Sequence, residues 1–220
     1  GSILPEFKEQ TVLESWDGKK QAFVTQLAKK KIRMNQLFTH TSGIVYPIFT
    51  YKGRAGYMKE KIIDAWPGED ISLEENIKRL AGVPLAHEPG EGNTYGMNMD
   101  VLGRVIEVLD GRPFAKYMRE ELFRPLKMKD TGFAVPKNKW NRVSSVYTTK
   151  DGKLALFDES VFDEKAPNNK PEWWKRNPDK IALGGAGLIS TAIDYALFCK
   201  CWSMEVNLTA NESLAARLLI

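Results

Sequence analysis

The chain has 220 residues, of which 43% are hydrophobic and 27% charged. This composition is typical of a folded globular protein and excludes a largely disordered one. The 32 basic and 28 acidic side chains leave a formal charge of +4. The densest basic run, residues 29–33, contains no aromatic residue, so we expect no nucleic-acid partner. No apolar stretch reaches the ~18 residues of a membrane-spanning helix, so we expect no membrane span.

The sequence predicts a single partial domain over residues 1–220. Residues 3–33 are expected to form an extended lead-in followed by a helix at 19–31. Residues 34–140 are expected to form a helical lobe. It begins with a short helix at 34–39 that turns Leu37 and Phe38 inward, and a second helix is expected at 57–65.

Two stronger helix signals follow in this lobe. Ser72 and Glu75 have the spacing of a capping box, which predicts a helix of about ten residues that ends near Gly82. Apolar residues then cover more than one face of the segment after residue 97, so we expect a helix buried among its neighbours. Gly111 supplies a left-handed stop, and Pro113 begins a further helix over 113–123.

The remainder is predicted to contain one hairpin and one helix. Residues 141–165 alternate weakly around Asp151 and Gly152, a pair typical of a two-residue hairpin turn. Residues 166–220 are expected to contain a tryptophan-bearing loop, a glycine turn at 184–187 and a last helix at 190–202. The predicted fold class is therefore α+β and mostly helical.

The cysteines and histidines give little sign of a metal site. Cys199 and Cys201 lie two residues apart in a predicted helix and point to different sides, so no disulfide is expected between them. Two thiols and two distant histidines make a poor metal site, so we expect neither metal nor cofactor. Reduced cysteines favour an intracellular, cytoplasmic protein. For His40 a structural role at a helix end is favoured, and for His87 an exposed loop position, with a catalytic role as the alternative.

A serine nucleophile cannot be identified within these residues. The chain has no G-x-S-x-G motif, and none of its ten serines is followed by lysine three residues later. That spacing on a helix would place an amine beside the hydroxyl. If the protein is a serine hydrolase, its nucleophile must come from elsewhere.

Four segments, in this order, resemble the serine β-lactamase-related hydrolases, and most closely their carboxylesterase and acyltransferase branch. They are "IRMNQLFTHTSGI", "PLAHEPGEGNTYGMNMDVLGRVIEVLDGRPF", "LFRPLKMKDTGF" and "GGAGLISTAIDYALF". The resemblance covers roughly residues 30–220. It implies the helical lobe of the β-lactamase/transpeptidase-like fold, with most of the antiparallel sheet missing. It also implies a small-molecule ester or acyl substrate and a serine acyl-enzyme.

By position, the resemblance assigns the family's proton-handling tyrosine to Tyr95. Its phenol is then expected to face an open cavity, and a base role requires a neighbouring ammonium to favour the phenolate. Substrate contacts are expected from Asn98, Gly185, Ala186 and Trp173. The alternatives are a packed tyrosine, a purely structural glycine turn and a tryptophan loop that only packs on the surface.

The departures from the family pattern shape the functional hypothesis. Penicillin-degrading members have asparagine two residues after the tyrosine, where this chain has Met97, which favours an esterase or acyltransferase. The resemblance places Ile3 just after the helix that carries the family's S-x-x-K motif. It places the last residues of the chain before a later family motif, which lines the opposite wall of the site. We therefore expect the isolated chain to be inactive, with self-association through an exposed apolar face. A non-catalytic binding module and a penicillin-recognising protein are the alternatives.

Overall fold

The computed structural model of the protein describes residues 3–20, 22–46, 54–64, 70–157, 172–175 and 180–205, without the side chains of 54–56, 173 and 202–205. Its strands are β1 (Thr11–Asp17), β2 (Ala22–Leu27), β3 (Tyr147–Lys150) and β4 (Lys153–Leu156). Its α-helices are α1 (Met34–Phe38), α2 (Arg54–Lys59), α3 (Leu73–Ala81), α4 (Asn98–Asp110), α5 (Phe114–Tyr117) and α6 (Ala192–Glu205). Short helical segments are η1 (Pro5–Phe7), η2 (Met118–Phe123), η3 (Lys137–Arg142) and η5 (Trp173–Lys175). The α+β class is confirmed, and within the described ranges no helix is long and apolar enough to cross a bilayer.

The predicted helix at 19–31 is wrong, because this segment belongs to an antiparallel hairpin. β1 pairs with β2 from Thr11 opposite Leu27 to Asp17 opposite Ala22. The Asp17 carboxylate accepts the backbone N–H groups of residues 19 and 20 at 3.0 and 3.1 Å, which closes the turn. The Asp17-Gly18 pair is a hairpin signal that the sequence already contains. Hydrogen bonds between β1 and Leu85 tie this hairpin to the rest of the protein.

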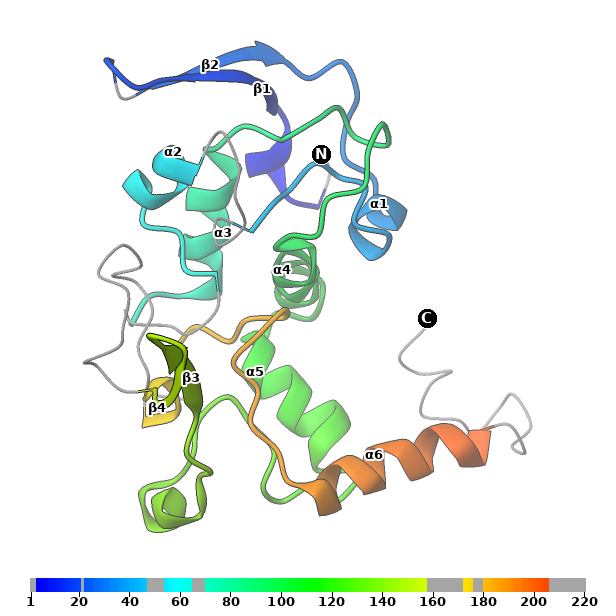
Figure 1. The fold of residues 1–220 in the computed structure, drawn as a ribbon. Helices are drawn as coiled ribbons and strands as arrows, with labels where there is room; N and C mark the ends of the chain where they lie inside the picture. Colours follow the sequence, from blue (N-terminus) through cyan, green and yellow to red (C-terminus); the bar gives the residue numbers. More distant parts are fainter. Residues whose placement is uncertain are drawn as a thin grey trace.

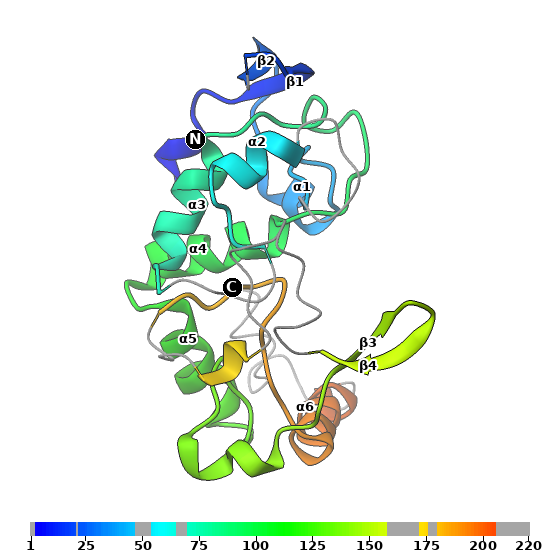
Figure 2. The ribbon, with the colours of Figure 1, turned by 60° about the vertical axis from the view of Figure 1, so that its left-hand side comes forward.

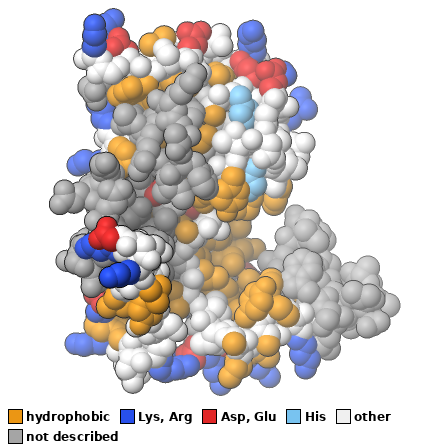
Figure 3. Space-filling view, in the orientation of Figure 1, with side chains coloured by type: hydrophobic (Ala, Val, Ile, Leu, Met, Phe, Trp, Pro, Cys, Tyr) orange, Lys and Arg blue, Asp and Glu red, His pale blue; other side chains and the backbone are white. Residues whose placement is uncertain are grey.

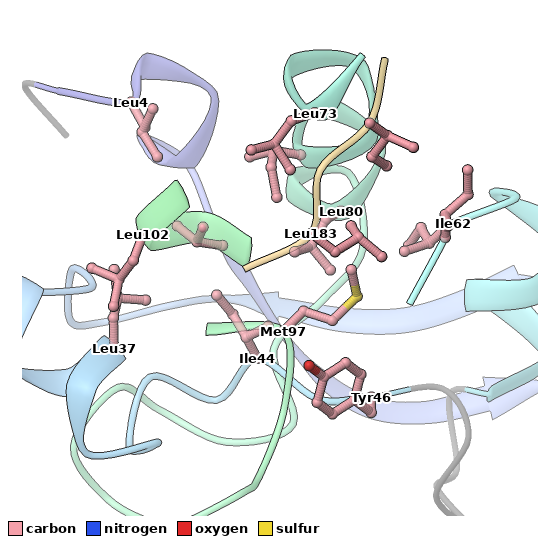
Figure 4. Close-up of a cluster of buried hydrophobic side chains, with 14 of the residues drawn as sticks. Leu4, Leu37, Ile44, Tyr46, Ile62, Leu73, Leu80, Met97, Leu102 and Leu183 are labelled. Atoms are coloured by element: carbon pink, nitrogen blue, oxygen red, sulfur yellow. The ribbon is translucent and has the colours of Figure 1, made fainter. Parts of the chain in front are cut away.

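The middle of the molecule is formed by α3 and α4 (Figure 1). As predicted, the Ser72 hydroxyl accepts the N–H of Glu75 at 3.0 Å, and α3 ends at Ala81, next to Gly82. Gly111 closes α4 with a φ of 83°, also as predicted. Figure 4 shows the apolar core around these helices. Its labelled side chains are Leu4, Leu37, Ile44, Tyr46, Ile62, Leu73, Leu80, Met97, Leu102 and Leu183.

Three expectations about helices need correction. α4 is buried only in its first half, since Leu109 near its C-terminal end is 70% exposed. In α1, Leu37 is buried but Phe38 is 64% exposed, because adjacent helical residues point about 100° apart. The helix expected at 57–65 lies earlier in the chain, as α2, and residues 62–64 follow it without helical structure.

The C-terminal half agrees more closely with prediction. β3 and β4 form the expected hairpin, and its turn residues Asp151 and Gly152 have φ values of 50° and 74°. Residues 180–191 pass beside α4 and continue to α6 (Figure 2). Cys199 and Cys201 lie on α6 and are not joined to each other by a disulfide. Residues 181–183 are buried, so the glycine turn that follows them is held against α4.

Candidate active site around Tyr95

Tyr95 lies in the loop that leads into α4 and is 57% exposed. Gly96, the next residue, is buried, and a Cβ there would lie 2.1 Å from the carbonyl oxygen of Ile44. Only glycine therefore allows the loop to pass so close to the neighbouring backbone. The backbone N–H of Thr94 also donates to the His40 carbonyl at 2.9 Å. The loop is fixed on both sides of Tyr95.

Two other aromatic rings contact the Tyr95 ring. The centroid of the His40 ring lies 4.7 Å away, and that of Tyr46 lies 5.4 Å away, both in tilted arrangements. Such distances are typical of favourable aromatic pairs. The rings of His40 and Tyr46 come from one segment that is far from Tyr95 in the sequence, and the three rings together form what we call the Tyr95 cluster.

His40 is held by a buried polar network. Its backbone has a φ of 53°, just after α1. The side-chain amide of Asn98 donates to His40 Nδ1 at 2.9 Å, and the backbone N–H of Gly96 donates to the same atom at 3.4 Å. The Ser42 hydroxyl donates to Asn98 Oδ1 at 2.5 Å. With Nδ1 accepting, the neutral imidazole carries its proton on Nε2, and burial lowers the pKa of His40, which favours this neutral form.

A second buried polar contact joins Tyr46 to Asp100. The Tyr46 hydroxyl lies 3.5 Å from Asp100 Oδ2, and the N–H of Gly185 donates to Asp100 Oδ1 at 3.2 Å. Burial raises the pKa of Asp100 to about 7, although these hydrogen bonds oppose the shift. Burial and the neighbouring Asp100 raise the pKa of Tyr46 far above its usual range, so Tyr46 stays a neutral phenol. Tyr95 is therefore the tyrosine of the cluster that can meet a substrate.

The structure brings some of the predicted site residues together. Asn98 contacts the cluster through its hydrogen bond to His40. Gly185 lies against Tyr46, since a Cβ at position 185 would be 2.1 Å from the Tyr46 hydroxyl oxygen. Asn98 has no exposed surface, and both ends of its amide are used within the protein. Ala186 follows Gly185 in the glycine turn and is half-buried. The side chain of Trp173 lies outside the described part of the structure.

The histidines have different surroundings. Figure 3 shows both histidine side chains on one face, with hydrophobic side chains nearby. In the loop before Tyr95, His87 Nδ1 lies 2.9 Å from the Glu88 carbonyl oxygen and Nε2 lies 3.0 Å from the Thr94 hydroxyl. Both ring nitrogens of His87 are therefore engaged within this loop.

The sequence did not reveal Tyr46 and Asp100 as parts of the cluster. A signal was present for Asp100, an acidic residue that directly precedes the apolar pair Val101 and Leu102 of α4. A carboxylate at such a position must be neutralised or hydrogen-bonded within the core. No comparable signal marks Tyr46, whose contact with Gly185 spans well over a hundred residues.

Comparisons with known proteins identify the family of the chain. A sequence profile of the beta-lactamase family matches residues 12–219. The chain belongs to the beta-lactamase family. Esterase EstB from Burkholderia gladioli is 38% identical over 102 residues, which make up 46% of this chain and 26% of EstB. The lovastatin esterase of Penicillium rubens is 28% identical over 222 residues, covering 97% of this chain and 48% of that enzyme.

A solved structure shares the fold of this family member. It is EstCE1, a hydrolase with promiscuous acyltransferase activity, and it superposes with a TM-score of 0.72 at 21% identity, over 98% of this chain and 53% of EstCE1. The resemblance of the four sequence segments to the esterase and acyltransferase branch is thereby confirmed. The chain spans about half the length of these relatives, or less.

Proposed function

We propose that this chain is part of a serine hydrolase that cleaves carboxylic esters or transfers acyl groups, with Tyr95 as its proton-handling residue. The observation that carries the proposal is the exposed Tyr95 phenol, which lies just before the N-terminus of α4 and packs against the rings of His40 and Tyr46. The esterases among its relatives support the reaction class. The substrate is a small-molecule ester or acyl donor.

The nucleophile is proposed to be the serine of an S-x-x-K segment outside these 220 residues. None of the ten serines in the chain has lysine three residues later. Ser42, the serine nearest to the cluster in the network described above, is fully buried, and its hydroxyl is used by Asn98 and by the N–H of Ile44. A serine so engaged cannot reach a substrate carbonyl.

Each half of the proposed reaction, acylation and deacylation of the serine, needs two proton transfers. Tyr95, as phenolate, accepts the proton of the serine hydroxyl while the serine oxygen attacks the ester carbonyl. When the alcohol leaves, Tyr95 returns that proton to it, which leaves an acyl-enzyme. Water or an acceptor alcohol then attacks the acyl carbon while Tyr95 accepts its proton, and Tyr95 returns that proton to the serine oxygen as the bond between the serine and the acyl group breaks. A lysine ammonium from the same S-x-x-K segment would stabilise the phenolate.

The other proposed site residues have different parts in this scheme. Asn98 is buried, so we assign it to positioning, through its hydrogen bond to His40. The N–H of Gly185 is already donated to Asp100, so Gly185 and Ala186 are proposed as a wall of the site and not as oxyanion donors. Trp173 is proposed as an apolar contact for the acyl or alcohol group.

A penicillin-directed activity has less support. Met97, two residues after Tyr95, is fully buried in the core (Figure 4), so no amide is presented at that position. We expect no covalent labelling of the chain by a fluorescent penicillin. Labelling of the folded chain that disappears when the chain is denatured before incubation with the penicillin would favour the penicillin-recognising alternative.

The proposal is tested on the longer protein that contains this chain. We expect it to hydrolyse a short-chain nitrophenyl ester and to be labelled by a fluorophosphonate, both of which require an activated serine. Replacing the serine of S-x-x-K by alanine should abolish hydrolysis and labelling. A folded longer protein that shows neither would contradict the proposal and would favour a non-catalytic binding module.

Self-association is a separate proposal. Several large apolar side chains are exposed on α4 and α6, including Leu109 and Ile193, which are 70% and 76% exposed. Contiguous exposed apolar surface favours association in water. Sedimentation velocity should therefore show concentration-dependent association of the chain, and a monomer at all concentrations would contradict this.

A further inference from the structure

A cavity of about 480 Å³ lies apart from the Tyr95 cluster. It is lined by residues of α5, η2 and η3, by residues 129–136, 143, 144 and 146, by Trp174 and by residues 188–191. No residue of the Tyr95 cluster lines it. Its volume falls within the ~300–1,000 Å³ that is usual for small-molecule sites.

Hydrogen bonds between distant segments build the walls of this cavity. Gly132 and Ile189 exchange backbone hydrogen bonds at 2.9 and 2.8 Å. The N–H of Val135 donates to the Trp174 carbonyl at 2.9 Å, and the Trp140 indole donates to the Val135 carbonyl at 2.9 Å. The walls are thus held in place without a ligand, so little order has to be gained on binding.

Apolar side chains make up much of the lining. They are Ala115, Phe123, Phe133, Ala134, Val135, Pro136, Val143, Val146, Trp174, Leu188 and Ile189. This lining favours a ligand with an apolar body, because burial of that body removes apolar surface from water.

The charged side chains that line the cavity are mostly cationic. They are Arg119, Lys129, Lys139 and Arg142, against the single carboxylate of Asp130. Asp130 already forms ion pairs with Lys139 and, at 2.9 Å, with Arg142.

Two of these cations remain for a ligand. Within the described ranges, neither Arg119 nor Lys129 forms an ion pair with a carboxylate. The nearby Asp194 carboxylate is buried and does not line the cavity, and it accepts hydrogen bonds from the N–H of Asp130 and the hydroxyl of Thr131. Counting Asp194, four cations still face two carboxylates.

We propose that this cavity binds a monocarboxylate with a medium-length apolar body. The apolar lining would take the body, and Arg119 and Lys129 would take the carboxylate. A neutral ligand would leave the positive charge unmatched, and a short carboxylate would leave the apolar lining empty. The proposal does not depend on the chemistry at Tyr95.

The test is calorimetric titration of the 220-residue chain with decanoate, compared with 1-decanol and butyrate. We expect saturable binding of decanoate at one site, weakened by added salt, because exposed ion pairs are screened. 1-Decanol and butyrate should each bind about tenfold more weakly or not at all. Equal binding of decanoate and 1-decanol, or no binding of decanoate, would overturn the proposal.

Variants locate the site. Arg119→Gln and Lys129→Gln should each weaken decanoate binding about three- to tenfold. Arg124→Gln removes an exposed arginine that does not line the cavity and should leave binding unchanged. Ser144→Trp fills the cavity from an exposed position and should abolish binding while thermal unfolding stays the same. Undiminished binding by Ser144→Trp, or by the Arg119→Gln/Lys129→Gln double variant, would place decanoate elsewhere and refute the assignment.

Discussion

Replacing Asp100 by asparagine should change how the stability of the protein depends on pH. The Asp100 carboxyl is buried, and within the described part of the chain no cationic side chain forms an ion pair with it. Asparagine has nearly the same size, and its side-chain oxygen can still accept the N–H of Gly185. The substitution therefore removes the titration of this site and leaves its packing in place.

The magnitude follows from the raised pKa of Asp100. Its pKa is about 7 in the folded protein and ~3.9 in an unfolded chain. The folded state thus holds a proton between about pH 4 and pH 7 that the unfolded state has already released. The stabilisation from this proton is fully present below about pH 4 and is lost as pH rises towards 7. With 1.36 kcal/mol for each pKa unit, the loss is about 4 kcal/mol.

Urea unfolding of both proteins across this pH range measures the effect. The unfolding free energy of Asp100→Asn minus that of the wild type should rise by about 4 kcal/mol from about pH 4 to pH 8. Taking the difference cancels the titration of His40 and of the other shared groups. Asp110→Asn is the matched control. Arg112 holds the pKa of Asp110 below its usual range. The unfolding free energy of Asp110→Asn minus that of the wild type should therefore fall as the pH rises, and only in the acidic range.

A flat difference for Asp100→Asn would refute the reasoning. It would mean that the carboxyl is ionised in the folded protein at neutral pH, through water or a cation near it. The raised pKa that we assign to the Asp100 carboxyl would then be wrong.

Two further predictions concern packing and hydrogen bonding beneath the cluster. Gly185→Ala should lower the unfolding free energy by about 1–3 kcal/mol, since the new Cβ would lie 2.1 Å from the Tyr46 hydroxyl oxygen. Gly18→Ala, whose Cβ would meet nothing within 4 Å, should change it by less than about 0.5 kcal/mol, and equal effects in urea unfolding would contradict the close approach. Asn98→Leu should cost about 1–3 kcal/mol because it removes the hydrogen bonds of the buried Asn98 side chain to Ser42 and His40. It should also alter the tautomer of His40 in NMR spectra, whereas Asn141→Leu at an exposed position should do neither.

Much of the local structure could be predicted from short-range chemistry. The turn at Asp151 and Gly152, the stop at Gly111 and the cap at Ser72 each depend on a few neighbouring residues. The missed hairpin of β1 and β2 shows the limit of this approach. Its strands are held partly by Leu85, far along the chain, and residues 19–31 alone have a polar composition that resembles a solvated helix.

The candidate site was predictable only in part. The family resemblance pointed to Tyr95, and its exposure agrees with a residue that can meet a substrate. Its surroundings depend on tertiary contacts that no local pattern encodes. The ring of Tyr46 lies against that of Tyr95, although the two residues are far apart in the sequence. Gly185 approaches Tyr46 only because the segment of residues 180–191 packs beside α4. For the same reason the burial of Asn98 could not be predicted from its place at the start of α4, directly after a loop.

The most direct test of the central claim is the rate of ester cleavage by the Tyr95→Phe variant of the longer protein. Positioned proton transfer contributes about 10²–10⁴-fold, so kcat for a short-chain nitrophenyl ester should fall by a factor in this range. Tyr147→Phe, which removes the hydroxyl of a similarly exposed tyrosine on β3, should leave kcat unchanged. If the Tyr95→Phe variant retains kcat within about threefold of the wild type, Tyr95 does not handle the proton.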